Sequence, residues 1–207
     1  MRIAVFGGSG RTGQRIIDLA LAGGHAITTL ARDPGKLGAL AARCRVVPGD
    51  VLDPAAVART LEGADAVLSA LGNPLGSGGT ARSEGMRHIV AAMEARGIRR
   101  IIAIAGGGIL DAPEGGLRAD RPSFPPIFKP GNLEHQAAWQ ALRASTLDWT
   151  LACTPDLVPG PRTDRYRALA DMMPEGGRRI SLDDVASFML RELTSTAFSR
   201  RRVGLAD

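Results

Sequence analysis

Three evenly spaced glycines follow the first apolar run of the chain. In the stretch FGGSGRTG, Gly7, Gly10 and Gly13 stand between an expected strand over residues 2–7 and an expected helix over residues 12–22. Glycine permits a tight turn and lets backbone N–H groups approach a pyrophosphate, and the positive end of the helix favours the same anion. A glycine turn without a ligand is the alternative, but the strand–helix context argues for a dinucleotide loop. The loop residues expected to contact the nucleotide are Gly7, Gly8, Ser9, Gly10, Arg11, Thr12 and Gly13.

Apolar strands and helical segments alternate along the rest of the chain. Such an alternation predicts a parallel sheet with helices on both faces. We therefore expect one Rossmann-type domain over residues 1–207, a doubly wound α/β fold in three layers, α on β on α. The expected strands cover residues 2–7, 26–32, 45–50, 65–72, 99–106, 149–155 and 201–206. The expected helices cover residues 12–22, 34–42, 55–63, 80–96 and 134–144, and a short strand or turn followed by a helix is expected within 178–193.

Residues 107–133 interrupt this alternation with a stretch rich in glycine and proline. A connection of this length in a compact domain is usually functional or disordered. We expect it to form a substrate-side loop, in which Phe124 and Phe128 could cover an aromatic acceptor.

The residue at the end of the second expected strand bears on the choice of dinucleotide. An acidic residue there hydrogen-bonds the ribose 2′-hydroxyl of NAD, whereas arginine pairs with the 2′-phosphate of NADP. The stretch LARDP places Arg32 at this point, and Arg11 in the glycine loop could add a second contact. Asp33 leaves NAD open, because its carboxylate could turn toward the ribose. The fork geometry of arginine favours NADP(H) as the cofactor.

Two further segments follow expected strands at their carboxyl ends, where open α/β sheets bind ligands. Asp50 and Val51 come after the third strand and are expected at the adenine, although Asp50 could equally be a turn residue. The loop formed by Ala70, Leu71 and Gly72 comes after the fourth strand and is expected to pass beside the cofactor.

Composition narrows the range of partners and locations. Arginine carries nearly all the positive charge of a chain with net charge +5, but the arginines are scattered and no recognition motif accompanies them, so we expect no nucleic acid. Cys44 and Cys153 lack the spacing of a metal site or redox pair, which predicts no metal and a cytoplasmic setting. No apolar run reaches about 18 residues and glycine interrupts the first one, so neither a membrane span nor a signal peptide is expected.

Six segments together resemble the atypical short-chain dehydrogenase/reductases. They read GGSGRTG, LARDP, PGDVLD, DAVLSALG, SEGMRHIVAAMEARGIRRII and RRISLDDVASFML. Within that family, the chain is most similar to the biliverdin reductase B (flavin reductase) group and its bacterial NAD(P)H-binding relatives. The likeness covers most of the chain and is weakest over residues 107–133. It implies NADPH-dependent reduction of flavins, quinones or related planar acceptors.

The resemblance also implies roles for individual residues. It supports the phosphate loop, Arg32 and the adenine contact in the roles given above. It further implies that Pro155, Asp156 and Leu157, in a loop after the sixth strand, line the nicotinamide and that His135 lies near the substrate pocket.

The chain departs from its relatives after the fifth expected strand. Relatives carry hydroxyl side chains there, whereas this chain has Ala105, Gly106 and Gly107. We expect these residues to form a backbone wall beside the nicotinamide. Such a wall has no hydroxyl but permits close stacking of a flat acceptor.

The usual acid of short-chain dehydrogenases is absent from the sequence. That acid is the tyrosine of a Tyr-x-x-x-Lys motif. The single tyrosine, Tyr166, is followed by RALA, so no lysine stands four residues after it. His135 is the remaining candidate, because an unperturbed imidazole pKa near ~6.5 suits proton transfer. A packing or surface role at the start of a helix is the alternative for His135, and solvent can protonate a reduced flavin or quinone.

These observations predict an NADPH-dependent oxidoreductase that transfers hydride to a small planar aromatic substrate such as a flavin, a quinone or a biliverdin-like molecule. A monomer or small homo-oligomer is expected. Two alternatives stay open. One is an NADP(H)-sensing module that regulates a partner without turnover. The other is a nucleotide-sugar epimerase, an activity that usually needs the tyrosine acid.

Overall fold

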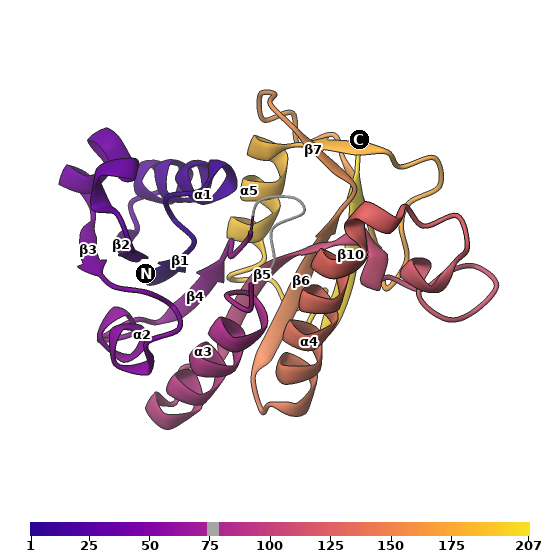
Figure 1. Ribbon diagram of the computed structural model, residues 1–207. Coiled ribbons are helices and arrows are strands. Elements are labelled where there is room, and N and C mark those ends of the chain that lie inside the picture. Colours follow the sequence, from indigo (N-terminus) through magenta and orange to yellow (C-terminus); the bar gives the residue numbers. More distant parts are fainter. Residues whose placement is uncertain (74–78) are drawn as a thin grey trace.

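The computed structural model describes residues 1–73 and 79–207, which are built around one eight-stranded sheet (Figure 1). The strand order is β3-β2-β1-β4-β5-β6-β10-β8. Neighbours run parallel except at one edge, where β8 is antiparallel to β10. The strands are β1 (Arg2–Phe6), β2 (Ala26–Ala31), β3 (Arg45–Pro48), β4 (Ala66–Ser69), β5 (Arg100–Gly106), β6 (Asp148–Thr154), β8 (Arg167–Ala170) and β10 (Arg201–Ala206).

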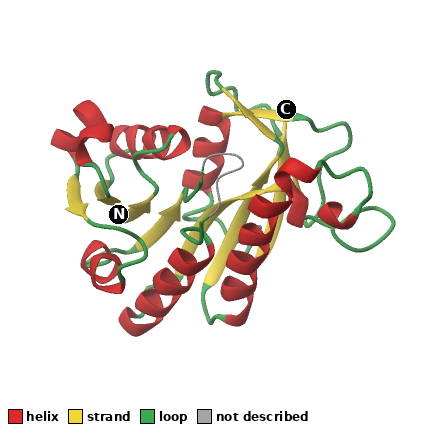
Figure 2. Cartoon of the chain, in the orientation of Figure 1, coloured by secondary structure: helices red, strands yellow, loops and turns green. Residues whose placement is uncertain are grey.

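Helices cover both faces of this sheet (Figure 2). The helices α1 (Arg11–Ala22) and α5 (Leu182–Arg191) pack together on one face, and α2 (Pro54–Thr60), α3 (Ser83–Arg96) and α4 (Lys129–Ala144) pack on the other. The apolar core is divided accordingly, because the sheet separates the side chains under α1 and α5 from those under the other three helices. The predicted Rossmann-type, three-layer fold is confirmed.

The strand order fixes where a ligand can approach the sheet. β1 lies between β2 and β4, and its last residue, Phe6, is opposite Leu30 on one side and Ser69 on the other. The chain therefore leaves β1 toward one edge of the sheet and later returns toward the other. Open α/β sheets bind their ligands at this reversal of strand order, beyond the carboxyl ends of the strands.

The expected helix caps are present at three positions. Asp53 accepts a hydrogen bond from the Ala55 N–H (2.9 Å) at the start of α2, and Ser181, one of two candidates, accepts one from the Asp184 N–H (3.0 Å) in α5. Gly97 ends α3 with a φ of 68°, a left-handed conformation that glycine adopts without strain.

The structure corrects the expected course of the chain between β5 and β6. The helix expected to begin at Glu134 begins at Lys129, with Pro130 in its first turn, where the missing N–H breaks no helical hydrogen bond. The connection before it is consequently shorter than residues 107–133. It contains three single-turn 3-10 helices, η2 (Gly107–Ile109), η3 (Arg118–Asp120) and η4 (Pro126–Phe128).

Three other elements also differ from expectation. The helix expected over residues 34–42 is a 3-10 segment, η1 (Pro34–Arg43), which Gly38 kinks with a φ of 55°. The residues after β6, expected as a loop, contribute β7 (Asp156–Val158), which pairs with β9 (Arg179–Ser181) in a separate two-stranded sheet. The edge strand β8 was not expected. Strands this short and exposed carry too little hydrophobic alternation to be recognised from sequence.

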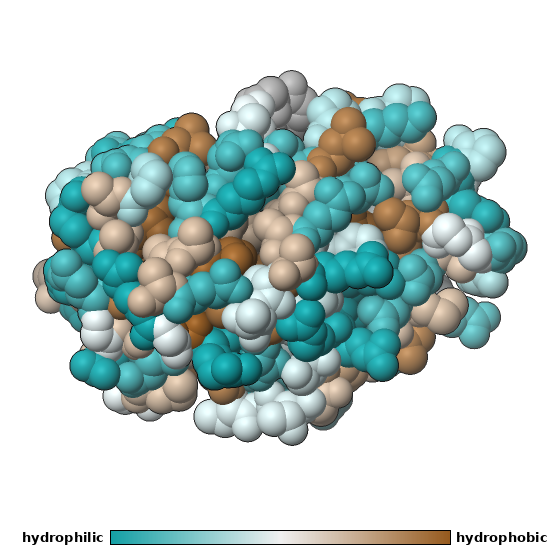
Figure 3. Space-filling model, turned by 90° about the horizontal axis from the view of Figure 1, so that it is seen from below, coloured by the Kyte–Doolittle hydropathy of each residue, from teal (hydrophilic) through white to brown (hydrophobic). Residues whose placement is uncertain are grey.

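Hydrophobic side chains are scattered among hydrophilic ones on the face seen in Figure 3. In the part of the chain that the structure describes, none of the helices combines the length and the apolar character needed to cross a bilayer.

Candidate dinucleotide site

The glycine loop makes two close backbone contacts that a side chain would block. Gly7 has a φ of 77°, and a Cβ atom there would overlap the carbonyl oxygen of Ala70, which follows β4. A Cβ atom on Gly13 would overlap the Gly7 carbonyl oxygen and approach the Gly8 Cα atom to 2.7 Å. These glycines therefore allow the tight turn and bring the start of α1 close to the ends of β1 and β4.

The first turn of α1 presents free backbone donors at this place. Its first helical hydrogen bond runs from the Gln14 N–H to the Gly10 carbonyl oxygen (2.9 Å), so the N–H groups before Gln14 in that turn lack helical acceptors. The turn contains no acidic residue, and Gly10 has no side chain to cap it. An anionic group such as a pyrophosphate would satisfy these donors and the helix dipole together.

Other members of the glycine loop support the turn. A Cβ atom on the buried Gly8 would overlap the Thr29 hydroxyl, so Gly8 allows the loop to lie against β2. The Gln14 side chain donates to the carbonyl oxygens of Ser9 (3.3 Å) and Lys36 (2.9 Å) and fixes the loop to η1. Arg11, the arginine of the glycine loop, is exposed.

Arg32 and Asp50 meet at the carboxyl ends of β2 and β3. The Arg32 side chain is 79% exposed and lies 3.8 Å from the Asp50 carboxylate. Asp50 also accepts a hydrogen bond from the Leu52 N–H (3.0 Å), so it has the turn role that the sequence left open. Asp33, the residue that kept NAD open, accepts a hydrogen bond from the Gly35 N–H (3.0 Å) and caps η1. Arg32 and Asp33 are both exposed at the end of β2, but the Asp33 carboxylate already caps η1.

Val51, expected at the adenine, and the segment 70–72, expected beside the cofactor, lie in different surroundings. Val51 is buried with its side chain against Gly85 of α3, and its carbonyl oxygen lies 3.0 Å from the Nδ1 atom of His88. Leu71 accepts a hydrogen bond from Arg82 Nε (3.3 Å) through its carbonyl oxygen, and Gly72 beside it is exposed. The structure therefore brings the segment 70–72 to the glycine loop, while the Val51 side chain packs in the core.

The glycines after β5 are covered by other residues. A Cβ atom on Gly106 would lie 3.1 Å from His135 Cδ2, and one on Gly107 would lie 2.7 Å from Met173 Cε. A Cβ atom on Gly108 would overlap the Asn132 amide oxygen and lie 2.9 Å from Phe124. The expected wall is therefore backbone, but it is not bare, because side chains of α4 and the loop before it pack closely over it. Gly106 and Gly107 are half-buried. Ala105, the third residue of the expected wall, lies in the core.

His135 does not have the pKa expected from its sequence position. Burial, and secondarily the positive charge of Arg82, lower the pKa of His135 to about 3. Its buried Nδ1 atom has no hydrogen-bond partner within residues 1–73 and 79–207. Burial therefore favours the neutral ring near neutral pH, and a catalytic role for His135 stays a prediction.

A polar cluster beside His135 was not recognised from the sequence. Ser83, at the start of α3, donates to the Glu134 carboxylate through its hydroxyl (2.9 Å) and its N–H (3.1 Å). Burial lowers the pKa of Arg82 despite the opposing charge of Glu134. Residues at the start of α3 and in the second turn of α4 meet here, and only the tertiary fold brings them together.

The residues after β6 and the single tyrosine lie in separate surroundings. Pro155 is half-buried, Asp156 is exposed at the start of β7, and Leu157 packs toward the α5 side of the core. The Tyr166 ring packs edge-on against Phe188 of α5, and its hydroxyl accepts a hydrogen bond from Arg191. The tyrosine is thus an anchor for the α5 layer.

A glycine loop on a helix N-terminus, at the strand-order reversal of a parallel sheet, defines a dinucleotide-binding protein of the Rossmann class. Residues 7–196 match the family model described as NAD(P)H-binding, and the chain belongs to this family. The NAD(P)H-binding family inferred from the sequence is confirmed.

Solved structures show the same fold over whole chains. A candidate exported protein from Burkholderia pseudomallei is 31% identical with a TM-score of 0.86, and both chains are covered completely. A candidate NADH-flavin reductase from Streptococcus pneumoniae is 24% identical with a TM-score of 0.86, over 100% of this chain and 99% of that one. A candidate epimerase from Bacteroides thetaiotaomicron is 27% identical with a TM-score of 0.86, over 99% and 96%.

The low pKa of His135 predicts a pH-dependent stability. Because the folded pKa of about 3 lies below the ordinary value of 6.5, the unfolded chain takes up the proton first as the pH falls. The stabilisation is complete above pH 6.5 and is lost toward pH 3. Between pH 7 and pH 5, the wild type should lose about 2 kcal/mol more unfolding free energy than His135→Gln, measured by urea denaturation.

The matched control is His25→Gln, which removes a histidine from a turn outside this cluster. It should keep the pH dependence of the wild type. Parallel curves for the wild type and His135→Gln would contradict the assignment of a neutral buried ring.

Proposed function

We propose that this protein is an NADPH-dependent oxidoreductase that reduces a small planar acceptor, such as a flavin, a quinone or a biliverdin-like molecule. The observation that carries the cofactor preference is the exposed Arg32 guanidinium at the end of β2, next to an Asp33 carboxylate that already caps η1. A 2′-phosphate is the partner that suits this arginine. The pyrophosphate would lie on the glycine loop and the start of α1.

When bound, the cofactor supplies a hydride, which is two electrons and a proton, to the acceptor. The glycine loop and the start of α1 would bind the phosphates, the residues after β4, β5 and β6 would hold the nicotinamide, and α4 would exclude water where it covers Gly106. The neutral His135 ring gives no proton from an imidazolium. A planar acceptor suits this site because its ring system delocalises the transferred electrons, and solvent supplies the second proton.

Two of the comparisons bear on the acceptor. The Streptococcus pneumoniae relative is described as a candidate NADH-flavin reductase, which agrees with a planar acceptor. The Bacteroides thetaiotaomicron relative is described as a candidate epimerase. Tyr166 lies against α5 with no lysine four residues later, which argues against epimerase chemistry here.

A second candidate function is sensing of NADP(H) without turnover. The observation that favours it is the packing of His135, Asn132 and Phe124 over the glycines after β5, which narrows the space beside the nicotinamide. A sensor would bind the dinucleotide and regulate a partner, whereas a reductase must admit an acceptor at the same place.

Location and assembly stay predictions. Cys44 and Cys153 are free thiols, and burial raises the pKa of both. Unpaired, unreactive cysteines agree with the cytoplasm. We propose a monomer or small homo-oligomer that takes a small aromatic substrate.

Arg32→Gln tests the cofactor preference. The substitution removes the cation but keeps a polar side chain of similar length. It should weaken NADPH binding by about 10- to 100-fold and change NADH binding by less than about twofold, measured by titration of each cofactor. Arg96→Gln, at the far end of α3, is the control and should bind both as the wild type does. Tighter binding of NADH than NADPH by the wild type would overturn the preference.

Oxidation of NADPH in the presence of FMN, riboflavin, biliverdin or simple quinones tests the reaction itself. We expect turnover with at least one of these acceptors. Tight NADPH binding without oxidation across the whole set would reject the reductase and support the sensor.

Gly106→Ser tests whether the backbone beside His135 belongs to the acceptor site. The new Cβ atom would lie 3.1 Å from His135 Cδ2 and 3.2 Å from Nε2, so the ring must shift. We expect NADPH affinity within about twofold of the wild type and kcat/KM for the acceptor reduced by about tenfold. The double variant with His135→Ala, which clears the space, should recover part of the loss. Loss of NADPH binding in Gly106→Ser would show that these glycines contact the cofactor phosphates instead.

A further inference from the structure

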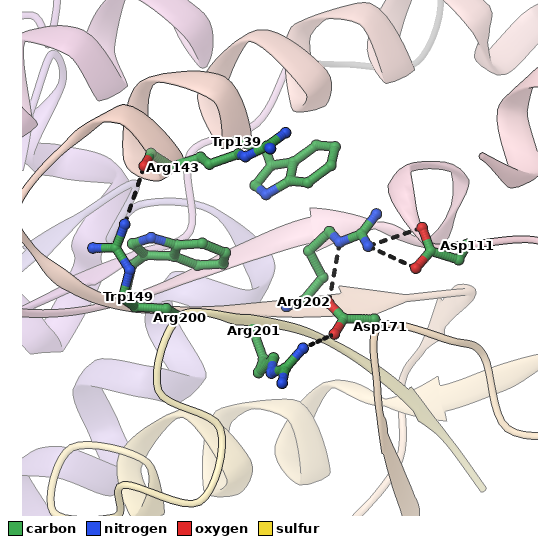
Figure 4. A pocket seen from close by; sticks show the side chains of 8 residues that line it. All are labelled: Asp111, Trp139, Arg143, Trp149, Asp171, Arg200, Arg201 and Arg202. Atoms are coloured by element: carbon green, nitrogen blue, oxygen red, sulfur yellow. Dashed lines mark hydrogen bonds and ion pairs between the residues drawn. The ribbon is translucent and has the colours of Figure 1, made fainter. Parts of the chain in front are cut away.

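A second cavity lies on the α4 face of the sheet, apart from the glycine loop. Its volume of about 440 Å³ is in the range of small-molecule sites. Its walls come from α4, β6, the start of β10 and the loops that follow β5 and β8 (Figure 4). The lining residues are Asp111, Trp139, Arg143, Trp149, Asp171, Arg200, Arg201 and Arg202.

Arginines that line the same cavity neutralise its two carboxylates. Arg202 has a side chain only 8% exposed and pairs with Asp111 (2.8 Å) and Asp171 (3.3 Å), as Figure 4 shows. Arg201 forms a second ion pair with Asp171 (2.8 Å). The acids are therefore fully engaged, and the cavity keeps the positive charge of its other arginines.

Two lining arginines have no carboxylate partner in the described part of the chain. Arg200 donates to the carbonyl oxygens of Ser145 (3.1 Å) and Leu147 (2.9 Å), which hold its side chain in place without cancelling its charge. The Arg143 guanidinium lies 5.9 Å from the centre of the Trp139 ring. An anionic group is the partner that these two cations lack.

The tryptophans add flat surfaces to the same cavity. The Arg202 guanidinium lies 4.2 Å from the centre of the Trp139 ring and holds that ring in place. The indole N–H groups of Trp139 and Trp149 are buried, and neither has a hydrogen-bond partner among residues 1–73 and 79–207. Buried donors without acceptors are rare, and an indole N–H can only donate. Because both N–H groups are inaccessible to solvent, the cavity contacts the indole rings.

We infer that this cavity binds a small planar organic anion, of which an aromatic carboxylate is the simplest example. Its ring would lie against the indoles, and its carboxylate would face Arg143, whose guanidinium lies beside Trp139 (Figure 4). A cation would be repelled by the net positive wall. An uncharged aromatic molecule would leave both unpaired arginines without a partner.

Tryptophan fluorescence offers a direct test, because Trp139 and Trp149 are the only tryptophans of the chain and both line the cavity. The full chain is titrated with benzoate. The comparison probes are benzamide, which keeps the ring without the charge, and inorganic phosphate, which keeps a charge without the ring. Benzoate should change the emission saturably, and the two comparison probes should bind at least about tenfold more weakly.

Arg143→Gln tests the charge on the cavity wall. Arg143 forms no ion pair among the described residues, so its replacement should leave the fold intact, as circular dichroism will check. We expect the dissociation constant for benzoate to rise by about tenfold. Arg165→Gln, an exposed arginine away from the cavity, is the matched control and should bind benzoate as the wild type does.

Three results would overturn the inference. They are the absence of a saturable change with benzoate, equal affinity for benzoate and benzamide, and equal affinity of the wild type and Arg143→Gln. An emission maximum that shifts with protein concentration, and does not shift with benzoate, would assign this face to a second copy of the chain. That result would also overturn the inference. The titration needs no nicotinamide cofactor, so its outcome is independent of the proposed reductase activity.

Discussion

The site depends on the absence of side chains at two strand ends. At the end of β1, Gly13 allows α1 to begin so close to the Gly7 carbonyl oxygen that a single methyl group would overlap it. At the end of β5, Gly106 allows the His135 ring of α4 to pack directly on backbone. One contact aims the free N–H groups of a helix at a ligand, and the other buries a histidine. Both set the distance between a helix and the sheet, on opposite faces of the same layer.

The buried histidine shows how packing determines the chemistry of a residue. An imidazole in solution is protonated in part near neutral pH, but burial against Gly106 and the nearby charge of Arg82 both disfavour the cation in His135. A site with a neutral histidine, and with its tyrosine placed in the α5 layer, suits a reaction in which the protein need not donate a proton. Hydride transfer to a delocalised ring meets that condition better than carbonyl reduction does.

Local signals in the sequence were sufficient for the seven parallel strands of the main sheet and for the glycine turn after β1. The glycine spacing, the cap at Asp53 and the helix end at Gly97 each depend on residues within a few positions of one another. The start of α4 was missed because the proline-rich stretch before it reads as loop, although Pro130 fits a first helical turn. The environment of His135 could not be predicted, because Arg82 and Gly106 reach it only through the packing of α3, α4 and β5. The same holds for Trp139 and Trp149, whose shared cavity exists only after β10 has joined the sheet.

Arg202 connects the tryptophan-lined cavity with the backbone that follows β5. A guanidinium can hold several acceptors at once in fixed directions, which an ammonium on a flexible chain does less well. Arg202 uses this capacity in full, because it pairs with Asp111 and Asp171 and also donates to the Ile109 carbonyl oxygen. Ile109 and Asp111 directly follow the glycines that pack under α4. One buried side chain on β10 therefore positions both the wall of the tryptophan-lined cavity and the backbone beside the expected nicotinamide position.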